Sequence, residues 1–285
     1  MAVAKVGVVG CGVMGSGIAE VSARAGFATV VREVNDALLQ QRVANIHSSM
    51  QRAMDKGKMK PEEMQAALGR LKATTKLADF RDCDLVIEAV IEDLNLKKEI
   101  FAELDRSCLP KTILASNTSC LPITELAQTT QRPDKVLGLH FFNPAPVMKL
   151  VELVKTPTTS KQTIHDIEDF VKAIEKTAIY VNDSPGFVVN RLVIAFLLEA
   201  IRALEAGIAS KEDIDKGIVL GLNHPMGPLA LLDFIGNDTT LYIARAMHER
   251  LKDPKFAPPK LLEQMVAEGR LGRKSGKGFY DYPQK

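Results

Sequence analysis

The sequence lacks a strong net charge and a long apolar run, and each absence excludes a class of protein. Its 285 residues carry 37 Lys and Arg against 35 Asp and Glu, a net charge of +2. Nucleic-acid-binding domains usually show a marked basic excess, so we expect no nucleic-acid partner. The longest apolar stretch, residues 187–200, is interrupted by Asn190, Arg191 and Glu199. A membrane-spanning helix needs about 20 predominantly apolar residues, so we expect no membrane span.

Cysteine is also scarce, and its spacing carries no motif. The four cysteines are Cys11, Cys83, Cys108 and Cys120, with no CxxC pair among them. This spacing predicts neither a metal site nor a disulfide framework, so we expect free thiols in a reducing compartment. The first residues lead directly into a strand-like segment, Lys5–Val9, without the features of a secretory signal. We therefore expect a cytoplasmic protein.

The order of apolar segments predicts an α/β fold with two domains. Strands are expected at residues 6–9, 28–31, 85–90, 113–115, 136–139 and 148–154, with helical patterns such as residues 36–54 and 94–104 between them. Strands that alternate with helices indicate βαβ units and a mostly parallel, Rossmann-like sheet with helices on both faces. Beyond residue 184 only helices and turns are expected. We therefore predict a Rossmann-like domain over residues 1–184 and an all-helical domain over residues 185–285.

A GxGxxG motif follows the first predicted strand and opens a helical pattern. In it Gly10 permits a tight turn, Gly12 lets the backbone approach a pyrophosphate, and Gly15 allows the helix to pack closely on the strand. The helix N-terminus supplies N–H donors for the phosphates. The motif, which includes Val13 and Met14, predicts a dinucleotide-binding turn.

An acidic residue ends the second predicted strand, where dinucleotide-binding folds place one. Glu33 lies 33 − 10 = 23 residues after Gly10. A carboxylate at this position accepts hydrogen bonds from the adenosine ribose and repels a 2′-phosphate, which favours NAD over NADP. The neighbouring Arg32 leaves the alternative that an arginine holds that phosphate. A structural glycine turn beside a surface glutamate is the other alternative.

A histidine and a glutamate stand out in two successive apolar strands. His140 ends the strand at residues 136–139, where a ligand of a parallel sheet binds. Glu152 interrupts the apolar run at residues 150–154, and a buried carboxylate is costly unless it is paired. A pair of the two would form a general base held by a carboxylate. The alternative is that Glu152 lies on the exposed face of an edge strand. The other histidines are expected to be surface or structural residues: His47, His165, His224 and His248.

Three further groups of polar residues have open roles. Residues 116–119 (Ser-Asn-Thr-Ser) follow a predicted strand and either cap the next helix, which we favour, or reach a ligand. Lys97 and Lys98 begin a helix beyond a strand end. Either one of them reaches a cofactor, or both are exposed to solvent. The basic residues of the segment 52–60 outnumber its one acid and suit phosphate binding, or else form a solvated helix face.

Taken together, these motifs resemble the 3-hydroxyacyl-CoA dehydrogenase family, and within it most closely the bacterial enzymes that act on 3-hydroxybutyryl-CoA. The resemblance spans the whole chain, from VGVVGCGVMGSGIA through AVIEDLNLKKEIF, ILASNTS, GLHFFNPAPVMKLVELV and SPGFVVNRL to NHPMGPLALLDFIG and LGRKSGKGFYDY. It departs at Cys11, and at Cys120 and Pro122, where serines are usual.

The resemblance implies an enzyme that reversibly oxidises short-chain (S)-3-hydroxyacyl-CoA to 3-ketoacyl-CoA with NAD. His140 would be the general base, Glu152 its partner, and Ser119 and Asn190 the residues that hold the substrate oxygens. Coenzyme A would contact Ser49 and Lys56. The residues implied as NAD contacts are the glycine-rich turn with Glu33, Glu92, Lys97, Ser119, Asn143 and Lys274. The resemblance also implies that residues 1–184 form an NAD-binding domain and that residues 185–285 form a substrate-binding domain through which the chain makes a homodimer.

Several alternatives stay open beside this resemblance. Asn190 is otherwise a buried structural residue, and Lys274 a surface residue of a basic segment. A sugar-acid dehydrogenase of the L-gulonate type would share the His–Glu pair without a coenzyme A site. A non-catalytic NAD-binding structural protein is less favoured, because His140, Glu152, Ser119 and Asn190 are all present.

Overall fold

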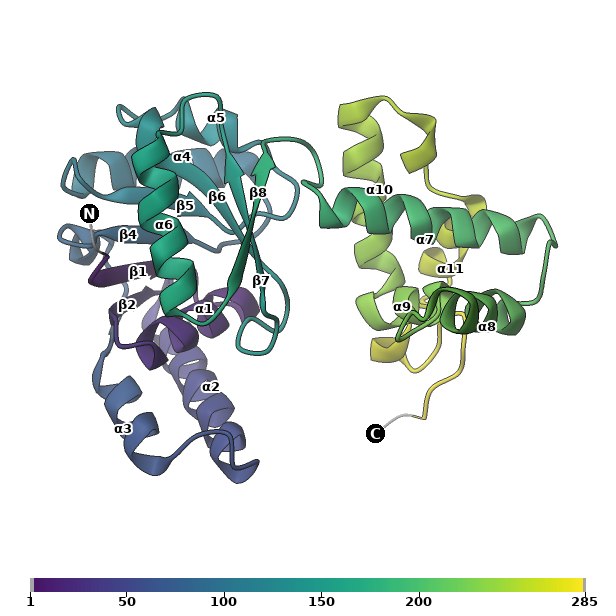
Figure 1. Cartoon of the computed structure of the whole chain (residues 1–285), viewed down its shortest axis with the longest axis horizontal. Coiled ribbons are helices and arrows are strands. Elements are labelled where there is room, and N and C mark those ends of the chain that lie inside the picture. The colour runs from purple at the N-terminus through teal and green to yellow at the C-terminus, as the bar shows by residue number, and fades with distance from the viewer. Residues whose placement is uncertain (1–2, 284–285) are drawn as a thin grey trace. The chain divides into compact units, whose positions relative to one another are not determined.

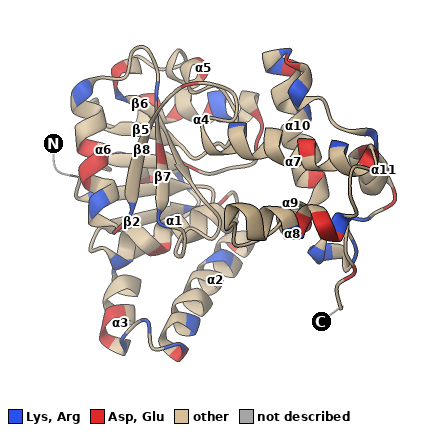
Figure 2. Ribbon diagram, turned by 45° about the vertical axis from the view of Figure 1, so that its right-hand side comes forward, with Lys and Arg blue, Asp and Glu red and all other residues tan. Residues whose placement is uncertain are grey.

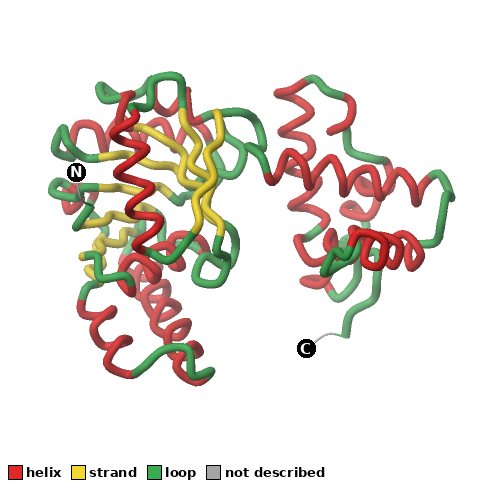
Figure 3. Tube along the Cα trace, viewed as in Figure 1, coloured by secondary structure: helices red, strands yellow, loops and turns green. Residues whose placement is uncertain are grey.

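The structure, a computed structural model, describes residues 3–283. The chain divides into two units, Met1–Asp183 (unit 1) and Ser184–Lys285 (unit 2). Figure 1 labels most of their helices and strands, and Figure 3 shows that the strand segments (yellow) belong to unit 1. The change of pattern near residue 184 therefore coincides with a change from an α/β unit to a helical one.

Unit 1 is built on one eight-stranded sheet with the order β3-β2-β1-β4-β5-β6-β7-β8. Neighbouring strands are parallel, except for β6 and β7, which are antiparallel. This confirms the predicted mostly parallel sheet. The strands are β1 (Lys5–Val9), β2 (Ala28–Arg32), β3 (Leu71–Thr74), β4 (Leu85–Glu88), β5 (Ile113–Ser116), β6 (Val136–Phe141), β7 (Leu150–Lys155) and β8 (Thr177–Asn182).

The sequence interpretation missed two of these strands, β3 and β8. They form the two edges of the sheet, where only one neighbour contributes hydrogen bonds. β3 has four residues and one buried side chain, and β8 buries only Val181 of its six. Neither strand shows the buried apolar run by which the interior strands were recognised. The omission of β8 matters for the site, because it left β7 as a candidate edge strand.

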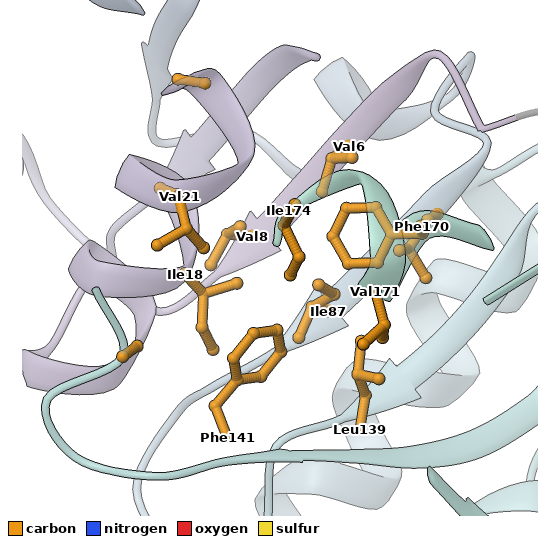
Figure 4. Close-up of a cluster of buried hydrophobic side chains, with 14 of the residues drawn as sticks. Val6, Val8, Ile18, Val21, Ile87, Leu139, Phe141, Phe170, Val171 and Ile174 are labelled. Carbon is orange, nitrogen blue, oxygen red and sulfur yellow. The ribbon is translucent and has the colours of Figure 1, made fainter. Parts of the chain in front are cut away.

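Helices cover both faces of the sheet, as predicted. Side chains of β1, β4 and β6 pack on one face against α1 (Val13–Arg24) and α6 (Lys161–Ala173), with Ile18 and Phe170 among them (Figure 4). On the other face, Phe80 lies against Gly7 and Ile123 against Gly138. The other helical segments of unit 1 are α2 (Asp36–Asp55), α3 (Pro61–Gly69), η1 (Leu77–Phe80), α4 (Leu94–Ser107), α5 (Ile123–Ala127) and η2 (Pro133–Lys135).

Unit 2 is helical, as predicted, and has its own hydrophobic core. Its core includes Leu197, Leu229, Met247 and Phe256, which are fully buried. Among the described residues of unit 2, β structure is limited to isolated bridges. None of the helices within residues 3–283 combines the length and the hydropathy needed to cross a bilayer. The helical segments are α7 (Val189–Glu205), α8 (Lys211–Leu222), α9 (Pro228–Ile235), α10 (Asn237–Leu251), η3 (Pro254–Phe256), α11 (Lys260–Ala267) and η4 (Arg273–Ser275).

The turn between β1 and α1 packs so closely that only glycine fits at two positions. Gly10 has a φ of +90°, and a Cβ there would lie 2.7 Å from the Ala89 carbonyl oxygen. A Cβ on Gly15 would lie 1.8 Å from the Gly10 carbonyl oxygen, whereas a Cβ on Gly12 would meet no heavy atom within 4 Å. Gly10 and Gly15 are therefore required by the fold, and Gly12 is not.

A pair of alanine substitutions tests this distinction. Gly15→Ala should lower the free energy of unfolding by about 3 kcal/mol, because the clash is with backbone and no rotamer relieves it. Gly12→Ala should cost less than about 1 kcal/mol, the usual difference between glycine and alanine at a helix N-cap. Urea unfolding followed by circular dichroism measures both. Equal losses in the two variants would contradict the packing argument.

Candidate active site

The carboxyl ends of the parallel strands bring most of the predicted site residues to one edge of the sheet. β1 leads into the glycine-rich turn, β2 into Glu33, β4 into Glu92, and β5 into Ser119, while β6 ends beside His140. The chain runs outward from β1 to β3 in one direction and from β4 to β8 in the other. Such a switch of direction leaves a crevice at the strand ends, where ligands of α/β sheets bind.

His140 and Glu152 are direct partners across the antiparallel pair of β6 and β7. His140 Nδ1 lies 2.6 Å from Glu152 Oε2, and the imidazole packs against the Phe142 ring at 4.6 Å between centroids. With an ionised Glu152, Nδ1 carries the hydrogen of this bond, which fixes the tautomer of the ring. A carboxylate in this position can orient a histidine that acts as a base.

Both members of this pair are buried. Glu152 is 0% exposed and His140 is 6% exposed. β8 pairs with the outer side of β7, so β7 is an interior strand. The alternative of an exposed Glu152 on an edge strand is therefore wrong, and the missed strand β8 is the reason that the sequence left it open.

The glycine-rich turn has the features that a dinucleotide requires. α1 begins after Gly12 without a side-chain cap and without an acidic residue in its first turn, so its first N–H groups suit a phosphate. Glu33 Oε1 accepts a hydrogen bond from the Cys11 N–H at 2.9 Å, which holds the carboxylate against the turn. The Arg32 side chain instead donates from Nε to the Thr75 carbonyl oxygen at 3.3 Å. The residues present at this turn therefore fit a dinucleotide.

A buried ionic network lies between β4 and α4. Lys97 Nζ is 2.6 Å from Glu88 Oε1 and 3.3 Å from Glu92 Oε2. Lys97 is 1% exposed and Glu88 is 0% exposed, so the alternative of a solvated Lys97 is wrong. Lys98, by contrast, forms a half-exposed pair with Glu125.

The sequence interpretation missed Glu88. Its second oxygen accepts a hydrogen bond from Ser116 Oγ at 2.6 Å, and Oε1 also accepts one from the Val90 N–H at 2.7 Å. Glu88 thus joins β4, β5 and α4 through one carboxylate. A charge within an apolar run, here residues 85–90, was the available signal, the same one that identified Glu152.

Glu92 connects this network to Ser119. Its Oε1 accepts hydrogen bonds from Thr118 Oγ1 at 2.6 Å and from the Ser119 N–H at 2.9 Å. Burial alone would raise the pKa of Glu92, but the Lys97 ammonium and these hydrogen bonds outweigh it and hold the pKa below its usual value. The stabilisation that this gives is present at neutral pH and is lost as the pH falls through the lowered pKa.

The polar residues 116–119 form the turn after β5 and do not cap a helix. α5 begins after Pro122 and has no side-chain cap. Thr118 Oγ1 instead accepts a hydrogen bond from the Leu121 N–H at 2.9 Å. Asn117 Oδ1 accepts one from the Phe141 N–H at 2.9 Å, which ties the end of β5 to the residue that follows His140. The capping interpretation was therefore wrong.

Ser49 and Lys56 lie in the wall of a cleft of about 690 Å³. The cleft runs along α1 and α2 and reaches Gly12 at one end and Asn143 on the β6–β7 loop. Arg24, Arg42, Arg52, Lys56, Lys58 and Lys149 line it, with Glu20 as its one acid. The basic segment 52–60 thus contributes to a concave surface, which favours phosphate binding over a solvated helix face.

The cysteines are unbridged and buried. Burial raises the pKa of the Cys11 thiol, and it raises the pKa of Cys83 to about 12 and that of Cys108 to about 11. Cys11 is 0% exposed, so it has the small apolar role rather than that of a reactive thiol at the turn. No group of His, Cys, Asp and Glu within residues 3–283 is arranged to hold a metal ion.

Two predicted site residues lie in unit 2. Asn190 lies in the first turn of α7 and is half-buried. Lys274 Nζ pairs with Asp238 at 2.6 Å and is about half exposed.

Comparison with known proteins identifies the family. Residues 5–184 match the family model of the 3-hydroxyacyl-CoA dehydrogenase NAD-binding domain, and residues 186–282 match that of its C-terminal domain. The chain belongs to the 3-hydroxyacyl-CoA dehydrogenase family. It is an oxidoreductase with NAD as its cofactor.

Relatives of known name match this family member over nearly its whole length. A 3-hydroxybutyryl-CoA dehydrogenase of Mycobacterium tuberculosis is 52% identical over 283 residues and covers 99% of each chain. The crystal structure of M. tuberculosis FadB2 has a TM-score of 0.96 at 51% identity, covering 99% of this chain and 100% of that one. That of (S)-3-hydroxybutyryl-CoA dehydrogenase PaaH1 from Ralstonia eutropha has the same TM-score and coverage at 44% identity.

The buried pair of Glu88 and Lys97 can be tested by neutralising one partner. Glu88→Gln should lower the free energy of unfolding by about 3 kcal/mol, because it leaves the Lys97 ammonium buried beside an amide. Glu125→Gln is the matched control. It breaks the half-exposed pair between Glu125 and Lys98, the residue next to Lys97 on α4, and should cost less than about 1 kcal/mol. A loss in Glu88→Gln no larger than that of the control, measured by urea unfolding, would show that the network is not stabilising.

Proposed function

We propose that this enzyme reversibly oxidises short-chain (S)-3-hydroxyacyl-CoA, such as 3-hydroxybutyryl-CoA, to the 3-ketoacyl-CoA. The buried pair of His140 and Glu152 at the carboxyl edge of the sheet carries the proposal. It lies in the same unit as a complete dinucleotide turn. The names of the relatives that match nearly the whole chain supply the substrate class.

The chemistry assigned to the chain is movement of a proton. Bound NAD would supply the hydride acceptor for carbon 3 of the substrate. His140 takes the proton of the 3-hydroxyl group as the carbonyl forms and returns it in the reverse direction. Glu152, 2.6 Å from Nδ1, fixes the ring and stabilises the imidazolium. Glu92, which pairs with Lys97, accepts a hydrogen bond from the Ser119 N–H and so holds Ser119 in position.

The remaining predicted residues are assigned to binding. Ser119 and Asn190 would hold the substrate oxygens, and Ser49 and Lys56 would contact coenzyme A in the cleft. The Lys97 ammonium pairs with the carboxylates of Glu88 and Glu92. We therefore propose that Lys97 acts on NAD binding indirectly, by holding Glu92 in position. The NAD contacts proposed are Gly10, Gly12, Val13, Met14, Gly15, Glu33, Glu92, Ser119, Asn143 and Lys274.

Acetoacetyl-CoA with NADH is the substrate pair that tests the function. The purified enzyme should consume NADH, followed by its absorbance, and should use NADPH poorly because Glu33 repels a 2′-phosphate. Consumption with a keto sugar acid but not with acetoacetyl-CoA would favour the sugar-acid dehydrogenase instead. Consumption with neither would favour a non-catalytic NAD-binding protein.

The role of His140 is checked with the same assay. His140→Ala should lower kcat by about 10²–10⁴-fold, the usual contribution of a positioned base. Its affinity for NADH, measured by fluorescence, should stay close to that of the original enzyme. His165→Ala on α6 is the control, since that histidine is exposed. Turnover by His140→Ala equal to that of the control would exclude the assigned role.

We also propose that unit 2 forms a homodimer through α8. No described residue of this 12-residue helix is buried, and Leu220 and Leu222 are 73% and 62% exposed. A helix with no buried side chain and with large exposed apolar ones is typical of an interface. Leu220→Lys with Leu222→Lys should convert a dimer to a monomer in sedimentation equilibrium. A monomer before substitution, or a dimer after it, would contradict the proposal.

A further inference from the structure

The cleft that holds Ser49 and Lys56 continues into a second hollow that the proposed function does not use. The second hollow has a volume of about 400 Å³. It shares Arg24, Lys58 and Lys149 with the walls of the cleft, so the two form one continuous depression in unit 1. We call this second hollow the basic hollow. Its wall comes from the end of α1, the loop between α2 and α3, the β6–β7 loop and the turn after α6.

A buried lysine forms part of this hollow. Lys176 is 7% exposed, and its ammonium donates hydrogen bonds to the carbonyl oxygens of Ala145 and Met148, both at 2.6 Å. It forms no ion pair with any carboxylate of residues 3–283. Burial lowers the pKa of Lys176, and the neighbouring charges of Lys149 and Arg24 lower it further. These cations therefore repel one another, and an anion among them would relieve the repulsion.

The acidic residues that line the basic hollow are too few to balance its basic residues, and one of them already accepts a hydrogen bond. Glu63 caps α3 by accepting a hydrogen bond from the Lys60 N–H at 2.9 Å, and Glu175 follows the end of α6. Against them stand Arg24, Lys58, Lys149 and Lys176.

Arg24 is the one cation of the basic hollow with an ion pair among the described residues. It pairs with Glu20, which lies in the adjoining cleft, at 3.2 Å. Figure 2 shows the Lys and Arg segments (blue) along α2 and on the loop that joins it to α3. Lys58 on that loop and Lys149 on the β6–β7 loop are exposed to a ligand.

We propose that Arg24, Lys58 and Lys149 form a subsite for a phosphate monoester, and that this group is the 3′-phosphate of coenzyme A. The inference rests on the proposed function, which places coenzyme A in the adjoining cleft. Cations that converge from separate segments can bind a phosphate dianion together. The arginine guanidinium donates paired hydrogen bonds to it, and each lysine contributes a positive charge. The subsite distinguishes coenzyme A from carriers that end in pantetheine or lack the 3′-phosphate.

A comparison of two substrates in two proteins tests the subsite. KM is measured for acetoacetyl-CoA and for its 3′-dephospho analogue with saturating NADH at low ionic strength. In the original enzyme the analogue should have a KM about tenfold higher, a usual effect of a charge-assisted contact. In Lys58→Gln/Lys149→Gln the KM for acetoacetyl-CoA should rise to that of the analogue, so the tenfold ratio should fall to about one. Lys161→Gln, an exposed lysine outside both hollows, should keep the ratio.

The outcomes separate this subsite from the proposed function. An equal KM for both substrates in the original enzyme, or a ratio that persists in the double variant, overturns the subsite while leaving the function intact. If acetoacetyl-CoA is not turned over, calorimetry with adenosine 3′,5′-bisphosphate and adenosine 5′-monophosphate replaces the kinetics. The bisphosphate should bind about tenfold more tightly, and only with both lysines present. Lysine-dependent binding of inorganic phosphate, with no preference between the nucleotides, would show a site for free anions and overturn the assignment.

Discussion

The reversal of strand direction between β6 and β7 is the constraint on which the candidate site depends. In an antiparallel pair, directly opposite side chains lie within reach of one another. His140 and Glu152 are such a pair, so the ladder itself sets their contact. β8 pairs with the outer side of β7, so β7 is an interior strand, and the Glu152 carboxylate on it is buried. A dry carboxylate orients the imidazole more strongly than a solvated one would.

Two fully buried carboxylates, Glu88 and Glu152, interrupt apolar strands at this edge of the sheet. Each would be costly alone, but Glu152 meets an imidazole, and Glu88 meets an ammonium, a hydroxyl and an N–H group. Because the bonds of Glu88 join β4, α4 and the end of β5, the turn that bears Ser119 is built on ordered elements. Such support lets a site keep its geometry before a ligand arrives.

The features that could be predicted from the sequence are those that a local pattern of residues determines. Interior strands, the glycine-rich turn and the helical second unit each have a periodicity or a spacing of their own. The edge strands β3 and β8 were missed because half-exposed strands carry no apolar run. Without β8, the sequence left β7 as a candidate edge strand and the burial of Glu152 open. Glu88 was missed although its signal was present. The basic hollow was beyond prediction, since Arg24, Lys58, Lys149 and Lys176 meet only in the folded chain.

The burial of the four cysteines has a practical consequence. Thiol-directed probes react with exposed thiolates. Burial keeps all four thiols from such a probe, and the raised pKa of Cys11, Cys83 and Cys108 also suppresses their ionisation. A cysteine introduced on the surface, for example on the β6–β7 loop, would therefore be labelled far faster than the native ones. A fluorophore at that position would report occupancy of the cleft without prior removal of any native thiol.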